Sequence, residues 1–414
     1  MKVLIIDTSA KAGVSLGGGA RVAGSLFNGL EEHGIETYYL GYGNPYINPS
    51  KRAFTLSGGK VKVQASARKI LHRLGLNGIA ESIPGRIAYY SIYSLTGVYL
   101  EGAEKWIERI KPDIILASSI QDYVVLKRIK RLLGKAKIIY IEHANASGEY
   151  KNAFDYNALS LTFGTGMYKG LNASQESFFR FFDGVIALNK EQKDKIERLN
   201  PNVAIIHSSV LMENLKISRA KLKNLKKRLK LPNATKTILY LGRLSEAQKN
   251  ISTLILAFQG IKGNEFRLVI AGEGKSMSLY LNMSKSDGRI IMPGRVSEEE
   301  LGYYYALADL YVLPSVWESF NATMIEAAYF GCGLLLSRLA INRDITERFG
   351  KRLYTFDPYD ADELRRKIVS YFSDDNLRKR LKALSRDIAN EYSKEKQIKA
   401  YADCLKKLYK LGRF

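Results

Sequence analysis

Two glutamates, Glu318 and Glu326, have seven residues between them and carry the clearest chemical signal in this chain. Residues 308–314, just before them, form an apolar run typical of a buried strand, and residues 321–330 have a helical pattern. One carboxylate therefore lies in a strand-to-helix turn, and the other lies about two turns into the helix. The first N–H groups of a helix attract anions, so a phosphate there would have both carboxylates nearby. This suits a sugar nucleotide, with ribose hydroxyls on Glu326 and the sugar near Glu318. The alternative is purely structural: Glu318 complements the helix dipole, and Glu326 is a solvated side chain on the helix.

Arg243 and Lys249 follow a second apolar strand, which begins near Thr237. Open parallel sheets bind ligands at the carboxyl ends of their strands. Arginine offers a planar fork and lysine a point charge, so this pair could neutralise a leaving diphosphate. The alternative is that both are solvated surface charges, in a chain with 64 lysines and arginines.

His143, one of four histidines, follows the apolar strand 137–141. It is either a strand-end histidine bonded to a backbone carbonyl or a group that faces a substrate. Gly17, Gly18 and Gly19 follow the first strand, where glycine permits either a simple turn or close approach to a phosphate. A dinucleotide fingerprint is not met, because Val22 occupies its third glycine position and no acid ends the second strand. A dehydrogenase is therefore disfavoured.

These motifs resemble those of retaining GT-B glycosyltransferases of glycosyltransferase family 4, the glycosyl transferases group 1. Order and spacing agree from about residue 236 to 370. The matching segments are Gly17-Gly18 before a helix ending at His33-Gly34, Leu241-Gly-Arg-Leu244 with Lys249, Ile270-Ala-Gly-Glu-Gly274, Met292-Pro-Gly-Arg-Val-Ser-Glu-Glu-Glu-Leu301 and Glu326-Ala-Ala-Tyr-Phe-Gly331. Asn321 stands where many members have glycine, which bears on the donor sugar that fits.

The resemblance implies a metal-independent transfer from a UDP- or GDP-sugar, with no cofactor and no covalent nucleophile. It implies catalytic roles for His143 and Glu318. The residues that it implies for donor binding are Gly17, Gly18, Arg243, Lys249, Gly272, Gly294, Arg295, Val296, Ser319, Phe320, Asn321, Ala322, Thr323 and Glu326. In agreement with a metal-independent reaction, no Asp-x-Asp pair follows a strand end, and Asp360 is expected to be a helix N-cap.

Strands and helices alternate along both halves of the chain, which predicts an α/β fold with parallel sheets. The resemblance makes this a GT-B fold, with two Rossmann-like domains facing across a cleft and a C-terminal helix crossing back to the first. The expected domains are 1–210 for the acceptor, 211–390 for the nucleotide sugar and 391–414 for that helix. The expected strands of the first domain are 2–7, 36–40, 112–117, 137–141, 184–188 and 203–207, and the second alternation runs from 237 to 356.

Residues 42–110 interrupt the first alternation as a long insertion, and such insertions are usually functional or mobile. Part of it, 51–86, is basic and contains an amphipathic stretch at 68–74. Residues 208–218 read as the link between domains, and 221–230 as a strongly basic helix. The aromatic run 178–182 suggests either a membrane contact or a helix core face, and the buried strand behind it favours the core.

The net charge of +23 indicates a lysine-rich surface that could attract a polyanion, either an anionic membrane or nucleic acid, with nucleic acid the less favoured of the two. The two cysteines, Cys332 and Cys404, show no pairing pattern and fit a reducing compartment. The N terminus does not have the pattern of a signal peptide, and no apolar run is long enough to span a membrane. These features predict a cytoplasmic location, with peripheral contact at the inner membrane face.

The sequence thus predicts a retaining hexosyltransferase that moves a sugar from a nucleotide diphosphate to a hydroxyl of a glycan or a lipid-linked acceptor. Two alternatives stay open: a sugar-nucleotide epimerase on a similar scaffold, and a basic, non-catalytic polyanion-binding protein. The carboxylate pair with Arg243 and Lys249 argues against the second.

Overall fold

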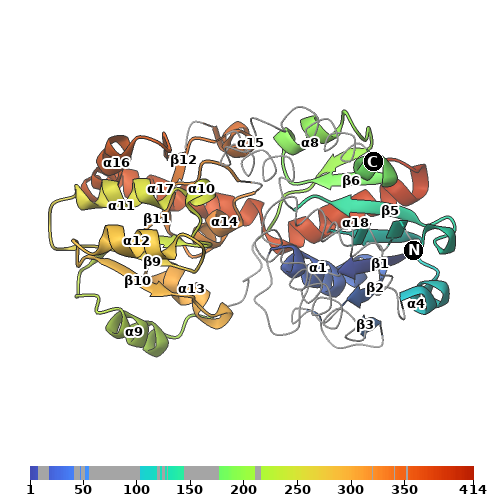
Figure 1. The fold of residues 1–414 in the computed structure, drawn as a ribbon, viewed down its shortest axis with the longest axis horizontal. Coiled ribbons are helices and arrows are strands. Elements are labelled where there is room, and N and C mark those ends of the chain that lie inside the picture. Colours follow the sequence, from blue (N-terminus) through green and yellow to red (C-terminus); the bar gives the residue numbers. More distant parts are fainter. Residues whose placement is uncertain are drawn as a thin grey trace, which may run out of the picture. The chain divides into compact units, whose positions relative to one another are not determined.

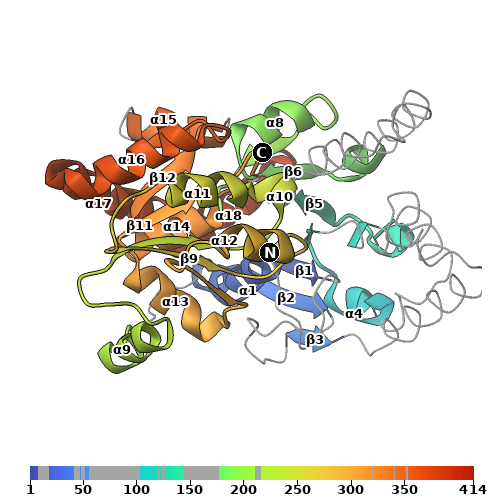
Figure 2. The same ribbon diagram turned by 60° about the vertical axis from the view of Figure 1, so that its left-hand side comes forward.

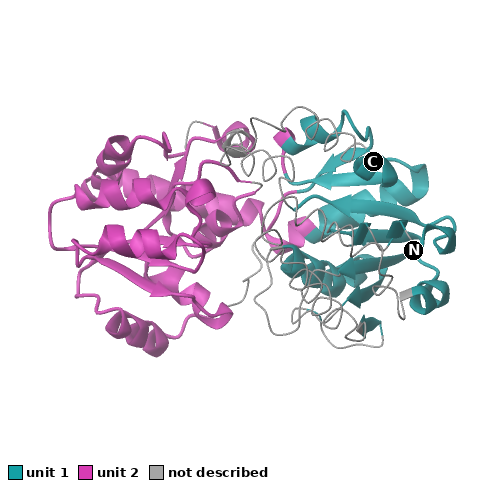
Figure 3. Ribbon diagram, in the orientation of Figure 1, with its two compact units in different colours: residues 1–188, 192–206, 398–414 teal, residues 189–191, 207–397 magenta. Residues whose placement is uncertain are grey.

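The computed structural model describes residues 1–7, 18–41, 47, 52–55, 103–118, 122–123, 126–127, 129–143, 177–209, 216–318, 320–339, 341–350 and 353–414. These residues form two compact units, each built on a parallel sheet (Figure 1 and Figure 3). Unit 1 comprises residues 1–188, 192–206 and 398–414, and unit 2 comprises residues 189–191 and 207–397. The predicted α/β class, with two Rossmann-like parallel-sheet domains, is confirmed.

The sheet of unit 1 has seven strands in the order β3-β2-β1-β4-β5-β6-β7, and every neighbouring pair is parallel. Its strands are β1 (Lys2–Asp7), β2 (Glu36–Gly41), β3 (Ala53–Thr55), β4 (Ile114–Ala117), β5 (Lys137–Ile141), β6 (Gly184–Ala187) and β7 (Val203–Ile205). The continuous apolar runs are buried because helices flank a parallel sheet, so little of it faces water. The sequence predicted each of these strands except β3, whose three residues lie inside the insertion.

The helices and 3-10 turns of unit 1 include α1 (Gly18–Gly29), η1 (Leu30–His33), α4 (Ala103–Ile110), η3 (Lys130–Leu132) and α8 (Lys190–Ile196), the last shared with unit 2. Val22, Leu26 and Leu30 are buried, as their helical spacing predicts. Phe179 and Phe182 belong to the apolar core with Tyr140 and Val185, and Phe178 and Phe181 pack against it. The core interpretation of the aromatic run is therefore confirmed.

Several sequence predictions fall on residues outside the described part of the chain. These are most of the basic insertion, 56–102 with the amphipathic stretch 68–74, and residues 210–215 of the predicted link. Gly17 and Ser319 also lie outside it.

The sheet of unit 2 has six strands in the order β10-β9-β8-β11-β12-β13, again all parallel. Its strands are β8 (Lys236–Leu241), β9 (Phe266–Ala271), β10 (Ile290–Gly294), β11 (Leu310–Leu313), β12 (Gly333–Ser337) and β13 (Thr355–Phe356). The chain order reverses where β8 pairs with β11, at Ile238 beside Leu310. Such a switch point opens a crevice at the carboxyl ends of the two strands, where ligands bind in open α/β sheets.

The helices of unit 2 are α9 (Arg219–Arg228), α10 (Glu246–Lys249), α11 (Ile251–Gln259), α12 (Met277–Ser284), α13 (Glu298–Leu307), α14 (Ala322–Tyr329), α15 (Ile341–Phe349), α16 (Ala361–Ser373) and α17 (Asp375–Glu391). The predicted basic helix is α9, which packs against α13 at the outer edge of the unit in both ribbon views (Figure 1 and Figure 2). Asp360 caps α16 by accepting the N–H of Glu363 at 2.7 Å, as predicted.

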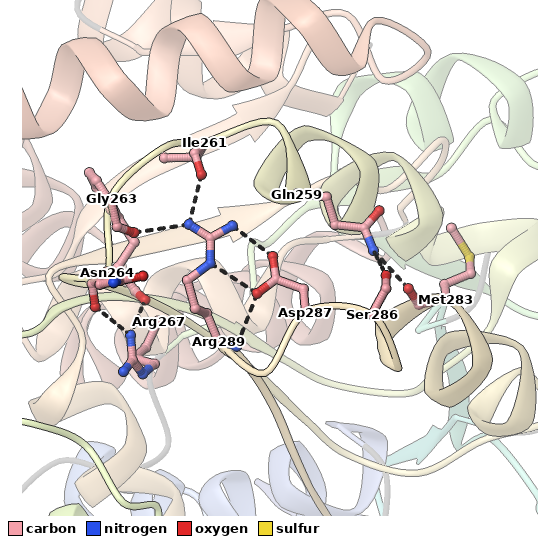
Figure 4. Close-up of polar contacts among 10 residues, drawn as sticks. Gln259, Ile261, Gly263, Asn264, Arg267, Met283, Ser286, Asp287 and Arg289 are labelled. Atoms are coloured by element: carbon pink, nitrogen blue, oxygen red, sulfur yellow. Dashed lines mark hydrogen bonds and ion pairs between the residues drawn. The ribbon is translucent and has the colours of Figure 1, made fainter.

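Arg289 fixes the loops at the amino edge of this sheet (Figure 4). Its Nε and Nη2 donate to the two carboxylate oxygens of Asp287, and its Nη1 donates to the carbonyls of Ile261 and Gly263. Gln259 donates to the carbonyl of Met283 in the same layer. A bidentate arginine of this kind is rigid, so β9 and β10 are anchored at the end opposite to the switch-point loops.

The last helix, α18 (Lys394–Leu411), leaves unit 2 and joins unit 1 from Ile398 onward. Ile398 packs closely against Gly29, since a Cβ added to Gly29 would lie 2.3 Å from Ile398 Cδ1. The N–H of Phe414 donates to Asn202 in unit 1 at 2.7 Å. Within unit 2, Gln397 donates to the carbonyl of His207, so the two ends of that unit are bonded to each other. The C-terminal helix therefore crosses back to the first unit.

Candidate donor site on unit 2

The loops after β8, β9 and β10 touch one another through glycines. The N–H of Gly272 donates to the carbonyl of Gly294 at 2.8 Å. A Cβ on Gly272 would lie 1.9 Å from the carbonyl oxygen of Gly242, and Gly272 has a φ of +140°. Only glycine can take this position, so the loops form a close-fitting backbone surface beside the switch point.

Arg243 lies just beyond β8 and is held by two neighbouring side chains, Tyr240 and Gln248. The Tyr240 hydroxyl donates to its carbonyl at 2.8 Å, and its Nη2 donates to Gln248 Oε1 at 2.6 Å. The carbonyl of Gln248 in turn accepts the N–H of Val316 at 2.9 Å. Gln248 therefore connects the guanidinium to the loop that follows β11.

Lys249 and Glu318 form a largely buried ion pair at the same strand ends. Lys249 Nζ contacts Glu318 Oε1, and the two side chains are 13% and 7% exposed. The Ser315 hydroxyl donates to the same carboxylate oxygen at 2.6 Å. A buried pair needs these additional bonds, because burial removes the water that would solvate each charge. An anionic ligand would compete with Glu318 for the lysine.

Glu326 is the second carboxylate, 6% exposed on α14. The Tyr305 hydroxyl donates to its Oε2 at 2.8 Å. Burial, with the charge of Glu326 adding to it, raises the pKa of Tyr305 well above its ordinary value, so the phenol stays protonated and donates. A buried carboxylate is thus held in place on the helix.

Some of the first N–H groups of α14, which the sequence predicts as an anion site, already make internal hydrogen bonds. The N–H of Ala322 donates to the carbonyl of Phe320 at 2.9 Å, and that of Met324 donates to the carbonyl of Asn321 at 3.0 Å. The Thr323 hydroxyl accepts from Tyr311 at 2.8 Å. A phosphate at this helix end would therefore displace or share internal bonds.

Arg295, Val296 and Phe320 are further predicted donor residues of unit 2 that the structure describes. Arg295 is about half exposed and pairs with Glu273 at 3.5 Å, and Val296 beside it is partly buried. Phe320 is buried and stacks on His207, with ring centroids 5.5 Å apart. The ring contact anchors the turn that carries the site.

The predicted residues of unit 1 form a separate group. His143 follows β5, and Gly18 begins α1. A Cβ on the next residue, Gly19, would lie 3.3 Å from His143 Cδ2, so a glycine here gives the imidazole room against the helix start. Burial lowers the pKa of His143 to about 4. The imidazole is therefore neutral at pH 7.

A histidine with a depressed pKa makes a specific pH prediction. The folded chain binds its proton less readily than the unfolded chain, so His143 makes the fold less stable as pH falls from about 6.5 to 4. We expect carbon-13 histidine NMR to show its imidazole titrating near pH 4, assigned by the signal that His143→Gln removes. A midpoint near 6.5 would show a solvated ring and contradict this.

Neither a candidate metal cluster nor a helix able to span a membrane occurs in the part of the chain that the structure describes. No group of three or more His, Cys, Asp or Glu side chains there is placed to hold a metal ion. In the same residues, every helix is too short or too polar to cross a bilayer.

The structure adds three residues that sequence reasoning missed, namely Gln248, Ser315 and Tyr305. Gln248 and Ser315 stand close in the sequence to Lys249 and Glu318, and this proximity could have identified them as candidates. Tyr305 stands 21 positions before Glu326 in a run of three tyrosines, and no spacing rule identifies it.

Residues 222–387 match the family model of the glycosyl transferases group 1. The match includes Arg243, Lys249, Glu318 and Glu326, and it covers less than half of the chain. The resemblance is therefore confirmed at the level of this family for the segment that forms most of unit 2.

Curated relatives match over similar segments. An alpha-galactosylglucosyldiacylglycerol synthase of Streptococcus pneumoniae is 34% identical over 131 residues, which are 32% of this chain and 34% of that protein. An alpha-monoglucosyldiacylglycerol synthase of the same organism is 26% identical over 211 residues, 48% of this chain and 45% of its own. The chain thus spans between a third and a half of the length of these relatives.

Solved structures match over nearly the whole chain. HepE of Anabaena in complex with UDP and glucose aligns with a TM-score of 0.69 at 15% identity, covering 99% of this chain and 100% of that one. A sucrose-phosphate synthase of Thermosynechococcus elongatus aligns with a TM-score of 0.71 at 16% identity, covering 99% of each chain. At such identities the likeness shows the fold, which is that of GT-B glycosyltransferases.

Proposed function

We propose that this protein is a retaining glycosyltransferase that moves a sugar from a UDP- or GDP-sugar to a hydroxyl of a lipid-linked or glycan acceptor. The observation that carries the proposal is the buried Lys249–Glu318 pair beside Arg243 at the switch point of the unit 2 sheet. Two cations and a carboxylate beside these strand ends, with a second carboxylate on the following helix α14, match the chemistry of a sugar bound to a diphosphate.

In this proposal the diphosphate lies against Arg243, Lys249 and the start of α14. These groups stabilise the charge that the diphosphate gains as it leaves, which a metal does in other transferases. Glu326 accepts the ribose hydroxyls, and the glycine-lined loops after β9 and β10 lie against the nucleoside. The backbone amides and cationic side chains of the protein would then suffice to stabilise the leaving diphosphate, without a cofactor.

The transfer step follows from these positions. The acceptor oxygen attacks the anomeric carbon from the face that the diphosphate leaves, and the carbon–oxygen bond to the diphosphate breaks with its electron pair remaining on phosphate oxygen. The hydroxyl proton passes to that phosphate oxygen. Because the acceptor attacks on the same face that the diphosphate leaves, the configuration at the anomeric carbon is retained. Glu318 stabilises the positive charge on the sugar. His143, as a neutral imidazole, helps to orient the acceptor hydroxyl.

A panel of nucleotides tests the donor assignment. Thermal shift with UDP, GDP, UDP-sugars and GDP-sugars should raise the unfolding temperature for one base, since a ligand at 100 times its dissociation constant adds about 2.7 kcal/mol. A nucleoside monophosphate should act more weakly, because it lacks the second phosphate. No stabilisation by any diphosphate would contradict a donor site.

The acceptor is proposed to be a lipid at the inner face of the cytoplasmic membrane, because several relatives are named as lipid glycosyltransferases. The surface that fits such a partner is α9 with its flanks, which we call the α9 cationic face. It carries no acid between 216 and 230, and its exposed cations are Lys216, Arg219, Lys221, Lys223, Lys226, Lys227, Arg228 and Lys230. Leu225 and Leu229 face inward, and the lysines of α9 are exposed to solvent, whereas Arg228 pairs with Glu300 at 2.8 Å.

We predict that the protein cosediments with vesicles of anionic phosphatidylglycerol at low salt and not with phosphatidylcholine alone. Replacing Lys223, Lys226 and Lys227 by glutamine should cost about 3 kcal/mol, because each basic residue near an anionic surface contributes about 1 kcal/mol. A matched control removes three exposed lysines elsewhere, Lys379, Lys399 and Lys406. Equal losses in the two variants would sink the α9 assignment, and tighter binding to duplex DNA would replace the membrane with nucleic acid.

A further inference from the structure

Glu326 has three rotatable side-chain bonds, so its carboxylate needs a partner to hold one orientation. The Tyr305 hydroxyl supplies that partner, donating to Oε2 at 2.8 Å in a buried setting. A carboxylate oxygen has two acceptor positions, so an oxygen that accepts from Tyr305 can still accept a ligand hydroxyl. The contact therefore orients the carboxylate without consuming its capacity to bind.

Tyr305 is itself held on every side. Its side chain is 0% exposed, and its ring stacks on Phe330 with centroids 5.9 Å apart and planes 9° apart. The Tyr311 ring lies 6.0 Å away, and the Tyr305 carbonyl accepts the Cys332 thiol at 3.2 Å. A ring packed in this way keeps one rotamer, so its hydroxyl stays in one place.

We propose that Tyr305 is a positioning residue that holds Glu326 in the orientation needed to accept the two hydroxyls of the donor ribose. This inference rests on the proposed function, because it requires a ribose at Glu326. The orientation is then fixed when the protein folds, so binding does not have to order the carboxylate, which is the general benefit of preorganisation.

The neighbouring tyrosine provides a matched control. Tyr304 is also buried on α13, but its hydroxyl contacts Arg228 of α9 at 3.5 Å and not Glu326. Tyr304→Phe and Tyr305→Phe each remove one hydroxyl from a buried ring of the same helix. Only the second removes the bond to the carboxylate.

The experiment compares each nucleoside diphosphate with its 2′,3′-dideoxy analogue by calorimetry, using UDP and GDP in parallel. Wild-type protein should bind the form with the diol more tightly, by on the order of 10-fold, and Glu326→Gln should lose most of that ratio. Tyr305→Phe should also lose most of the ratio while it binds the dideoxy form as the wild type does. Tyr304→Phe should keep the ratio.

The outcomes separate the two claims. If Glu326→Gln loses the ratio and Tyr305→Phe keeps it, the positioning role is overturned and the donor site stands. If Tyr305→Phe weakens both nucleotides equally, its role is structural, and the inference is again overturned. If Glu326→Gln itself keeps the wild-type ratio, the ribose assignment is wrong, and the role of Tyr305 falls with it.

Discussion

Replacing Glu318 with glutamine is expected to cut sugar transfer by on the order of 100- to 1,000-fold while the nucleoside diphosphate stays bound. The carboxylate charge is needed when positive charge develops on the sugar, and glutamine lacks it. Glutamine can still accept from Lys249 and Ser315, the two groups that contact Glu318 Oε1. Alanine is a poorer probe, because it would leave a largely buried lysine without its partner.

The two readouts for Glu318→Gln are a transfer rate and a nucleoside diphosphate affinity. Affinity should be equal to that of the wild type or higher, because the variant no longer competes for the charge of Lys249. Glu299→Gln, at an exposed position in the first turn of α13, is the matched control and should change neither. A Glu318→Gln enzyme that transfers sugar at the wild-type rate would remove Glu318 from the reaction.

Arg243→Ala is expected to weaken nucleoside diphosphate binding by on the order of 100-fold and to slow transfer further. A charged contact of this kind typically contributes a few kcal/mol, and 1.4 kcal/mol corresponds to a factor of ten. Because the diphosphate is present before reaction and gains charge during it, the loss should affect both affinity and rate.

The control for Arg243 is Arg267→Ala, at the amino edge of the same sheet. Arg267 donates to the carbonyls of Asn264 and Phe266, in the layer opposite to the donor loops. The Arg267→Ala variant should leave nucleotide affinity and the transfer rate unchanged. Such a result would show that the loss of one positive charge does not by itself explain the effect of Arg243→Ala. Similar losses in both variants would indicate a nonspecific effect of charge.

The sequence was most informative where a periodic pattern and a motif coincide. Strand β1 was predicted at its observed bounds, because a continuous apolar run between polar residues has few other interpretations. The placement of Arg243 just beyond β8 followed from the same alternation, whereas Lys249 lies at the end of the short helix α10. Strand β3 was missed, because three residues in a long insertion carry too little periodicity to register.

Contacts between distant segments were beyond sequence reasoning. Lys249 was predicted to contact the diphosphate and Glu318 to lie near the sugar. Their direct ion pair was not predicted, because it depends on how two loops that are distant in the sequence meet. The bond from Tyr305 to Glu326 depends on how α13 packs beside α14, which no local pattern encodes. The internal bonds at the start of α14 likewise follow from the turn geometry around Asn321.

The proposed transferase activity is tested most directly by identifying a reaction product. An α-linked UDP- or GDP-sugar is presented with a diacylglycerol or glycolipid acceptor in anionic vesicles. We expect a glycosylated lipid whose new anomeric linkage is α by proton NMR, formed in EDTA as well as in its absence, and nearly absent with Glu318→Gln. A β-linked product would contradict retention. Release of an epimerised nucleotide sugar without any transfer would contradict the central claim.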